Sequence, residues 1–188
     1  IPYQQDYKHV ASSYQTIWLD IEPKADNLRA QLKQKWRNQL NKSEKHNLEF
    51  LIDEKGETFL DFLMAYQHDL DVKNYQNINP ANLQKYFKSF IKTKSIVLVH
   101  AVKNNNKIAS ALILLHGHSA TYQIGLLTKS GRDLCANHFL LWKGILYLKE
   151  RGIKDFDLGG INEYDAKGIQ HFKEGLNGNK KHYKGIYS

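Results

Sequence analysis

Apolar residues in the first fifty positions are spaced as in one short strand followed by one long helix. The segment YQTIWLDI, from Tyr14 to Ile21, predicts the strand. Pro23 then suits a first helical position, where its missing N–H leaves no hydrogen bond unmade. We expect the helix over Lys24–His46, with apolar side chains repeating every four residues at Leu28, Leu32, Trp36 and Leu40.

The middle of the chain changes from helices to strands. A strand is expected over Leu48–Glu54 and a helix over Thr58–His68, and a further helix begins at Asn79, whose side chain can cap it, with Pro80 in the first turn. Three strand-like runs follow, joined by the hairpin-like segments KNNN and HGHS: Ser95–Val102, Lys107–Leu115 and Ala120–Leu127. These runs predict an antiparallel meander.

The last third of the chain predicts a crossover. A helix from about Leu134 to Arg151 is apolar almost all round, so other elements must cover it on several sides. The strand Ile153–Ile161 follows this helix and is therefore expected to run parallel to the strand before it. A short helix over Ala166–Glu174 and a last strand over His182–Ser188 complete the pattern.

The composition fits one globular domain. The chain has 188 residues, of which 41% are hydrophobic, and no apolar run approaches the ~18–20 residues that span a bilayer. Because it begins at Ile1 rather than Met, we expect a processed protein or the C-terminal part of a longer one. The single cysteine, Cys135, excludes a disulfide framework, and no metal-binding set of residues is evident.

The charge of the chain is strongly basic, with a formal net charge of +8 and a pI near 9.4. This charge indicates an anionic partner, although a basic protein from a basic proteome would look the same. Against only Asp26 and Glu44, the first long helix carries seven basic residues: Lys24, Arg29, Lys33, Lys35, Arg37, Lys42 and Lys45. Two interpretations stay open, a solvated helix face and a wall that contacts phosphate groups.

Two motifs near the C-terminus carry chemical information. D-x-G-G ends a strand at Asp157–Gly160, and G-x-x-x-F-K-x-G follows at Gly168–Gly175. Together with the order of the elements and the amino-acid sequences of the segments Trp36–Phe50 and Ile124–Gly160, these motifs resemble the Fem-type peptidoglycan aminoacyltransferases. That family is a branch of the GNAT-type N-acyltransferases.

The resemblance implies an α/β (α+β) fold of the GNAT type, in a single domain over residues 1–188. Its sheet is mixed, mostly antiparallel, flanked by helices and splayed between two strands. The walls of this V-shaped gap would be the strands Ala120–Leu127 and Asp155–Leu158. Backbone N–H groups near Gly125 or Leu126 would polarise the acyl carbonyl of the donor, as an oxyanion hole does. A plain strand bulge would equally explain Gly125.

Further donor contacts are expected at Leu127, at Asn137 and in the loop TKSGRD before the long helix. In that loop Gly131 and Arg132 suit a phosphate group, although Arg132 could also be a loop arginine without a ligand. Coenzyme A users of the superfamily carry Gln/Arg-x-x-Gly-x-Gly/Ala here, and this chain has one glycine of that pattern. The donor is therefore expected to be aminoacyl-tRNA or acyl-CoA, with no tightly bound cofactor.

Three side chains are candidates for catalysis. Lys173 matches the lysine of the family's Phe-Lys motif, and the resemblance implies that it stabilises the developing oxyanion or a donor phosphate. His171 could serve as an acid or base, and Asp157 lies on the strand that ends in the two glycines. A surface lysine and a turn-forming aspartate are the plainer interpretations of Lys173 and Asp157.

The acceptor is expected at Arg37, Tyr122, Gly159 and Gly160. The implied activity is transfer of an acyl or aminoacyl group onto a primary amine of a cell-envelope precursor, either a small molecule or lipid-linked. An acyl-CoA-dependent N-acetyltransferase is one alternative, and a non-catalytic half that binds tRNA or another anion is a second. We expect a cytoplasmic protein, with the inner face of the membrane and tRNA as candidate partners.

Overall fold

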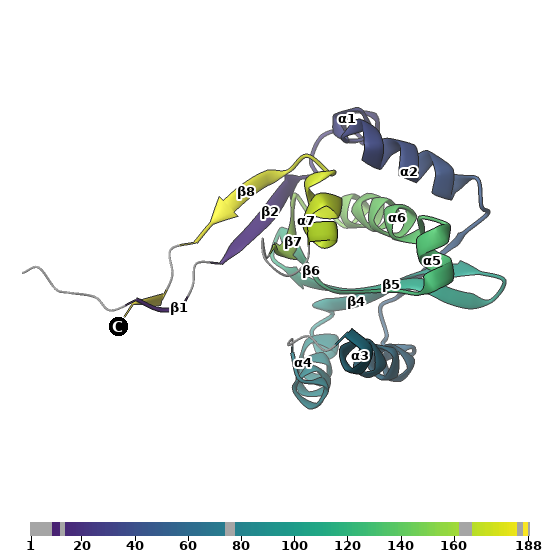
Figure 1. Cartoon of the computed structure of the whole chain (residues 1–188). Coiled ribbons are helices and arrows are strands. Elements are labelled where there is room, and N and C mark those ends of the chain that lie inside the picture. Colours follow the sequence, from purple (N-terminus) through teal and green to yellow (C-terminus); the bar gives the residue numbers. More distant parts are fainter. Residues whose placement is uncertain (1–8, 12–13, 74–77, 162–166, 184–185, 188) are drawn as a thin grey trace, which may run out of the picture.

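The computed structural model describes residues 9–11, 14–73, 78–161, 167–183 and 186–187, and its strands form one large sheet and one small sheet (Figure 1). The large sheet has seven strands in the order β3-β4-β5-β6-β7-β2-β8. Their bounds are β2 (Gln15–Asp20), β3 (Glu49–Asp53), β4 (Ile96–Lys103), β5 (Asn106–His116), β6 (Ser119–Leu127), β7 (Asp155–Gly160) and β8 (Asn179–His182). Every neighbouring pair is antiparallel except β6 and β7, which run parallel. The mixed, mostly antiparallel sheet expected from the sequence is therefore confirmed.

Helices cover both faces of this sheet in layers (Figure 1). One face carries α3 (Phe59–Lys73) and α4 (Pro80–Lys92), and the other carries α5 (Lys129–Asp133), α6 (Ala136–Glu150) and α7 (Lys167–Glu174). An outer layer of α1 (Ala25–Gln31) and α2 (Gln34–Glu44) lies over α6. As predicted, the Asn79 side chain caps α4 by accepting a hydrogen bond from the Ala81 N–H at 2.9 Å, and Pro80 occupies the first turn.

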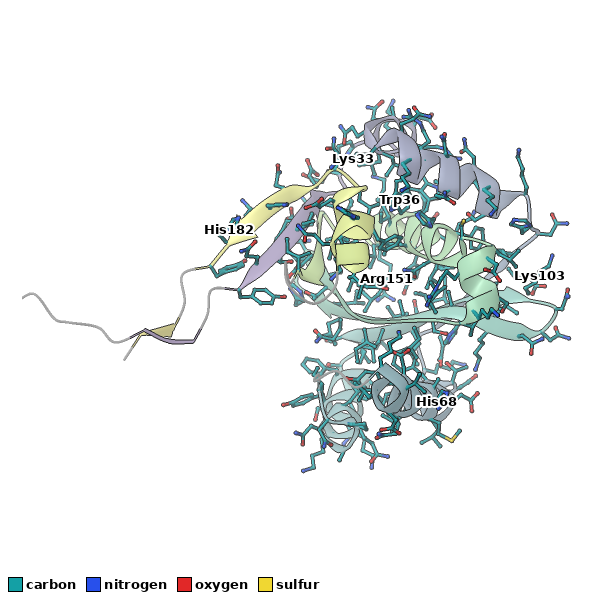
Figure 2. The ribbon with its side chains drawn as sticks, viewed as in Figure 1. Lys33, Trp36, His68, Lys103, Arg151 and His182 are labelled. Atoms are coloured by element: carbon teal, nitrogen blue, oxygen red, sulfur yellow. The ribbon has the colours of Figure 1, made fainter. Side chains whose placement is uncertain are left out.

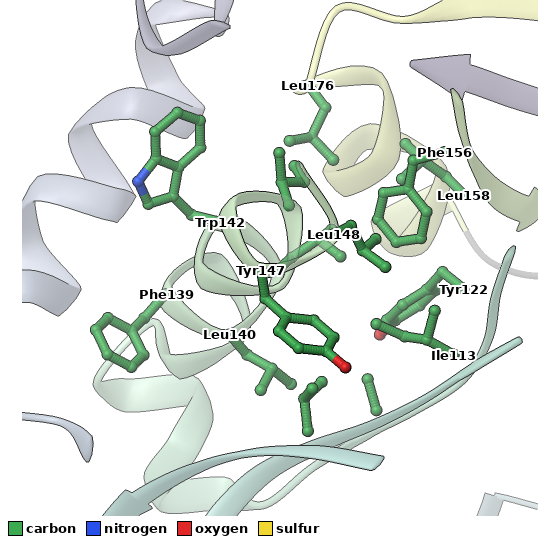
Figure 3. Packing of buried hydrophobic residues seen from close by; sticks show 14 of the residues in the cluster. Ile113, Tyr122, Phe139, Leu140, Trp142, Tyr147, Leu148, Phe156, Leu158 and Leu176 are labelled. Carbon is green, nitrogen blue, oxygen red and sulfur yellow. The ribbon is translucent and has the colours of Figure 1, made fainter. Parts of the chain in front are cut away.

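The helix α6 is the centre of the larger core. The sheet lies on one side of it and α2 on the other, so that Leu140 and Leu148 are fully buried. Figure 3 shows Phe156 and Leu158 of β7 directed toward this helix. A helix with no polar face thus has an apolar neighbour on both sides, as the sequence indicated.

The long helix expected over Lys24–His46 is wrong in one respect, because it is two helices. The backbone N–H of Lys33 donates to the carbonyl oxygen of Gly175 at 2.9 Å, and the chain bends between α1 and α2. The predicted apolar stripe is nevertheless confirmed, because all four of its members are buried: Leu28, Leu32, Trp36 and Leu40.

Two further expectations are corrected near the C-terminus. The segment expected as a loop before the central helix is the short helix α5, capped by Thr128, and Cys135 in a left-handed conformation separates it from α6. The last strand, expected over His182–Ser188, is displaced. β8 ends at His182, and β9 (Ile186–Tyr187) pairs with β1 (His9–Ala11), while residues 184–185 and 188 lie outside the described residues.

The β2–β8 pair leads away from the body of the molecule toward the small β1–β9 sheet (Figure 1). This arrangement places the described N-terminal and C-terminal segments side by side. Within the described ranges, no helix combines the length and the apolar character that a transmembrane span needs.

Candidate functional site

The strands β6 and β7 separate from one another to form a wedge. Only three pairs of residues join the two strands: Ser119 of β6 lies opposite Asp155 of β7, Ala120 opposite Phe156, and Thr121 opposite Asp157. Beyond Thr121, β6 continues to Leu127 with no further pairing to β7. The pairing of β6 with β5 is also irregular here, because Gln123 is an extra residue between two paired positions. The splayed sheet expected from the sequence is confirmed.

Tyr122 lies at the point where the two strands separate. Its side chain is buried, and burial raises the pKa of its phenol to about 12, against a smaller lowering by the neighbouring Asn137. The hydroxyl occupies the space where a side chain on Gly125 would be. Gly125 is itself exposed, so the tyrosine reaches across the bare backbone of this wall and stays protonated at neutral pH.

The opposite wall ends in a tight turn at Gly159. This residue has φ +72°, and a Cβ added there would be 2.6 Å from the carbonyl oxygen of Tyr122, so only glycine fits. The buried Asp157 holds the turn, because its Oδ1 accepts hydrogen bonds from the Gly159 N–H at 2.8 Å and from the Thr16 hydroxyl. The contacts of Asp157 are thus those of a turn-forming aspartate.

Lys173 reaches this turn from α7. Its side chain is only 6% exposed, and its Nζ donates to the carbonyl oxygen of Gly160 at 2.8 Å. Nζ also lies 5.9 Å from the centre of the Tyr122 ring and would be 3.7 Å from a Cβ on Gly159. Burial lowers the pKa of Lys173 to about 8, although the negative charge of Asp157 opposes this effect.

No carboxylate forms an ion pair with Lys173 among the residues that the structure describes. A lysine ammonium has three donors, and one of them is used by Gly160. With respect to the described residues, the side chain therefore brings a cation with free hydrogen-bonding capacity to the place where the two strands part.

The other residues of the Phe-Lys motif hold α7 in position. The Phe172 ring centre lies 5.9 Å from that of Trp36 and 5.0 Å from that of His138. Gly175 leaves no room for a side chain against Trp36, which lies where α2, α6 and α7 meet (Figure 2). The motif is thus one of packing residues around a single buried lysine.

The structure does not bring His171 to Lys173. The two residues are two positions apart on α7, which places their side chains on roughly opposite sides of the helix at about 100° per residue. Lys173 is buried and His171 is exposed. An imidazole in this position faces solvent rather than the wedge.

The segment expected to be a donor-binding loop, Thr128–Asp133, is mostly the helix α5, and its glycine, Gly131, is needed for packing. Gly131 is buried, its N–H donates to the Thr128 hydroxyl at 3.0 Å, and a side chain there would overlap the carbonyl oxygen of Ile108. Gly131 therefore serves the packing of α5 on β5 and has no free N–H for a phosphate. Arg132 is exposed at the end of α5.

The remaining expected contacts are divided between the wedge and other places. Asn137 is beside Tyr122, and its Oδ1 is buried without a hydrogen-bond partner among the described residues. Leu126 belongs to the core on the α3–α4 face, whereas Leu127 packs against the core around α6. The Arg37 guanidinium donates to the Ala30 carbonyl oxygen and to Gln34 Oε1, so it is held against its own pair of helices.

Two residues near the wedge were not identified from the sequence. Tyr14 is 51% exposed, and its ring contacts Gly160 closely enough that a Cβ there would be 3.0 Å away. Burial, with a smaller contribution from Asp157, raises the pKa of Tyr14. His138 lies between Trp36 and Phe172, and burial lowers its pKa to about 4, so that it is neutral at pH 7. No local pattern marks either residue, because pairing and packing between distant segments create both environments.

Comparison with solved structures identifies the fold. The crystal structure of FemX superposes with a TM-score of 0.77 at 13% sequence identity, over 98% of this chain and 63% of FemX. An aminoglycoside acetyltransferase from an uncultured soil metagenomic sample, solved with sisomicin, gives a TM-score of 0.51 at 11% identity over 66% of this chain and 84% of that one. The GNAT-type fold is therefore established.

Sequence comparison identifies the family. A curated relative, the Lipid II:glycine glycyltransferase of Staphylococcus haemolyticus (strain JCSC1435), is 25% identical over 100 residues, which are 53% of this chain. The match spans only 23% of that relative. The model of the FemAB family matches residues 73–188, a segment that contains the wedge, the Gly159 turn and Lys173. The chain belongs to the FemAB family.

Proposed function

We propose that this chain is a catalytic domain that transfers an aminoacyl group to a primary amine of a peptidoglycan precursor. Its family, and a relative whose name specifies glycyl transfer to lipid II, support this class of reaction. The observation that carries the proposal is the buried ammonium of Lys173 at the open end of the wedge. Buried lysines are normally paired, and a strongly shifted lysine in a gap is a candidate functional group.

The proposed reaction is a direct attack of the acceptor amine on the aminoacyl ester carbonyl. A C–N bond forms, the C–O bond to the ribose of the tRNA breaks, and the ribose oxygen leaves with a proton. With a pKa of about 8, Lys173 is roughly 90% protonated at pH 7. Its ammonium can therefore stabilise the tetrahedral oxyanion, together with backbone N–H groups of β6 near Gly125.

Three further side chains position the reacting groups. Asp157 and Thr16 fix the Gly159 turn, to which Lys173 is hydrogen-bonded through the neighbouring Gly160. They act on the reaction through the turn and touch no reacting atom. Asn137, with an unpartnered amide oxygen beside Tyr122, can accept a hydrogen bond from the substrate amine. His171 has no part in this scheme.

We propose aminoacyl-tRNA rather than acyl-CoA as the donor. Coenzyme A requires backbone N–H groups free to bind its pyrophosphate, and the Gly131 N–H is already bonded to Thr128. A net charge of +8 suits a polyanionic donor. The acceptor is then a small or lipid-linked muropeptide amine, on the cytoplasmic side of the membrane.

The test is transfer of a labelled amino acid from aminoacyl-tRNA to lipid II or to its nucleotide-linked precursor. Lys173→Met keeps the length of the side chain and removes the charge, so we expect kcat to fall about 10²–10³-fold, the loss typical of removing one oxyanion donor. Lys35→Met, on the exposed side of α2, is the matched control and should retain the activity.

Two results would reject the proposal. Equal transfer rates for Lys173→Met and the wild type would remove the lysine from the mechanism. No transfer by the wild type from either aminoacyl-tRNA or acyl-CoA, combined with measurable tRNA binding, would favour the non-catalytic alternative. That alternative is consistent with the chain spanning 63% of FemX.

A further inference from the structure

A long part of the chain has no acidic residue. From Val72 to Arg132 the sequence contains no Asp and no Glu, but it contains Lys73, Lys85, Lys88, Lys92, Lys94, Lys103, Lys107, Lys129 and Arg132. This segment includes α4, which lies on the outside of the molecule on the face opposite α6 and α7 (Figure 1). The surface around α4 is therefore the place to look for a second anionic partner.

The solvent side of α4 carries two stripes of different chemistry. Lys85, Lys88 and Lys92 recur at intervals of three and four, are exposed, and form no ion pair within the described part of the chain. Tyr86 and Phe90, four residues apart, are 52% and 38% exposed. We call these five residues the α4 patch.

The aromatic stripe borders an apolar groove of about 300 Å³ between α4 and the sheet. Its floor consists of Ile96, Leu112 and Leu114. Among the described residues of its lining, the hydrogen-bonding side chains are those of Tyr86 and Gln123, and Gln123 is the extra residue in the wall of the wedge. The groove has the size of a small ligand pocket but few groups that could recognise a polar ligand.

Acidic residues on the neighbouring helix α3 do not cancel the charge of the patch. Asp69 is paired with Lys73 at 2.6 Å, and Asp61 is paired with Lys107 at 2.9 Å. Asp71, the third acidic residue of α3, is exposed and accepts a hydrogen bond from Gln67. One carboxylate of α3 therefore stands against the three lysines of the α4 patch, which keeps a net attraction for an external anion.

We propose that the α4 patch binds the surface of an anionic phospholipid bilayer. The lysines would lie among the phosphate groups, Tyr86 and Phe90 at the level of the headgroups, and an acyl chain in the groove. This inference goes beyond the proposed aminoacyl transfer and does not depend on it. The extra residue Gln123 joins the groove to the wall of the wedge, so docking also brings the wedge close to the membrane.

Two other occupants fit the patch less well. RNA would use the lysines, but the described lining of the groove offers few donors or acceptors for the edges of bases. A second copy of the chain, docked patch to patch, would bring the same three lysines of both copies together, and like charges at an interface are repulsive. A lipid satisfies the cationic and the apolar parts at once.

The test is co-sedimentation of the full chain with vesicles of phosphatidylglycerol and phosphatidylcholine. We expect binding to vesicles rich in phosphatidylglycerol, weak binding to pure phosphatidylcholine, and release at 1 M salt, where screening is nearly complete. The triple variant Lys85→Gln/Lys88→Gln/Lys92→Gln should lower the partition coefficient about 150-fold, since each lysine near an anionic surface contributes about fivefold. Tyr86→Ser/Phe90→Ser should weaken binding to the same vesicles.

A matched triple variant separates the α4 patch from general charge. Lys24→Gln/Lys35→Gln/Lys45→Gln removes the same charge from exposed positions on and beside the outer helices α1 and α2, and it should bind like the wild type. An equal loss with both triple variants would overturn the proposal. The proposal would also be overturned if tRNA binding or dimer formation in solution depended on the α4 patch while vesicle binding did not. Circular dichroism of each variant shows that it is folded.

Discussion

Replacing Lys173 by methionine should stabilise the folded protein while it slows transfer. Lys173 is 6% exposed and, among the described residues, has one hydrogen-bond partner, the carbonyl oxygen of Gly160. Burial without a paired carboxylate disfavours the charged form, which is why the pKa falls from 10.5 to about 8. The folded state therefore contains a cation whose environment opposes its charge, and methionine has a similar length and no charge.

The size of the effect follows from the two pKa values. A fall from 10.5 to about 8, at about 1.4 kcal/mol per pH unit, corresponds to roughly 3 kcal/mol of lost stability. Loss of the hydrogen bond to Gly160 in the variant offsets about 1 kcal/mol. The variant should thus gain about 2 kcal/mol at pH 7, or about 4–8 °C in Tm for a chain of this length.

The sign of the pH dependence is also defined. Below pH 8 the folded and unfolded states both hold the proton, so the wild type bears the whole cost of burying the charge. Between pH 8 and 10.5 only the unfolded state holds it, and the cost disappears as the pH rises. The advantage of Lys173→Met should therefore be constant up to about pH 8 and shrink above it.

Urea denaturation of both proteins at pH 7, 8, 9 and 10 measures this difference directly. Other groups that titrate in this range are common to both proteins and cancel in the comparison. The reasoning is refuted if Lys173→Met is less stable than the wild type at pH 7, or if the difference between them is the same at pH 7 and pH 10.

Three further experiments test the turn and the lysine helix. Gly159→Ala should destabilise the protein by about 1–3 kcal/mol in urea titrations, because a side chain there is strained and meets the Tyr122 carbonyl. Gly152→Ala, also at positive φ but with open space around it, should cost less; equal losses would contradict the steric argument. Asp157→Asn and Thr16→Val should show a coupling of about 0.5–3 kcal/mol in a double-mutant cycle, and additive effects would mean that the two do not act together. His171→Ala should leave kcat within about twofold of the wild type, and a larger fall would return the imidazole to the mechanism.

Local patterns were sufficient to predict most of the secondary structure and the type of sheet. The meander of β4, β5 and β6 follows from three apolar runs with short polar joins, and the all-apolar helix α6 from the absence of a polar face. The cap at Asn79 and Pro80 follows from two adjacent residues. Each of these features depends on neighbours in sequence, which is why it can be read there.

The misplaced features depend on partners that are far away in sequence. The break between α1 and α2 reflects a hydrogen bond from Lys33 to Gly175. The contact of Tyr14 with Gly160 exists only because β2 lies beside β7. The family resemblance drew attention to Lys173, but its burial beside Gly159 is created by tertiary packing. The orientation of His171 toward solvent can be inferred only once Lys173, two residues further along the same helix, is known to point inward.

The anchoring of α7 has a consequence for the position of Lys173. The Gly175 carbonyl oxygen is bonded to the N–H of Lys33, and the Phe172 ring rests on Trp36, so the helix with the lysine is tied to the junction of α1 and α2. A displacement of that outer pair would therefore also move the helix that carries the ammonium. The position of the charged group at the wedge thus depends on contacts made at the junction of the two outer helices.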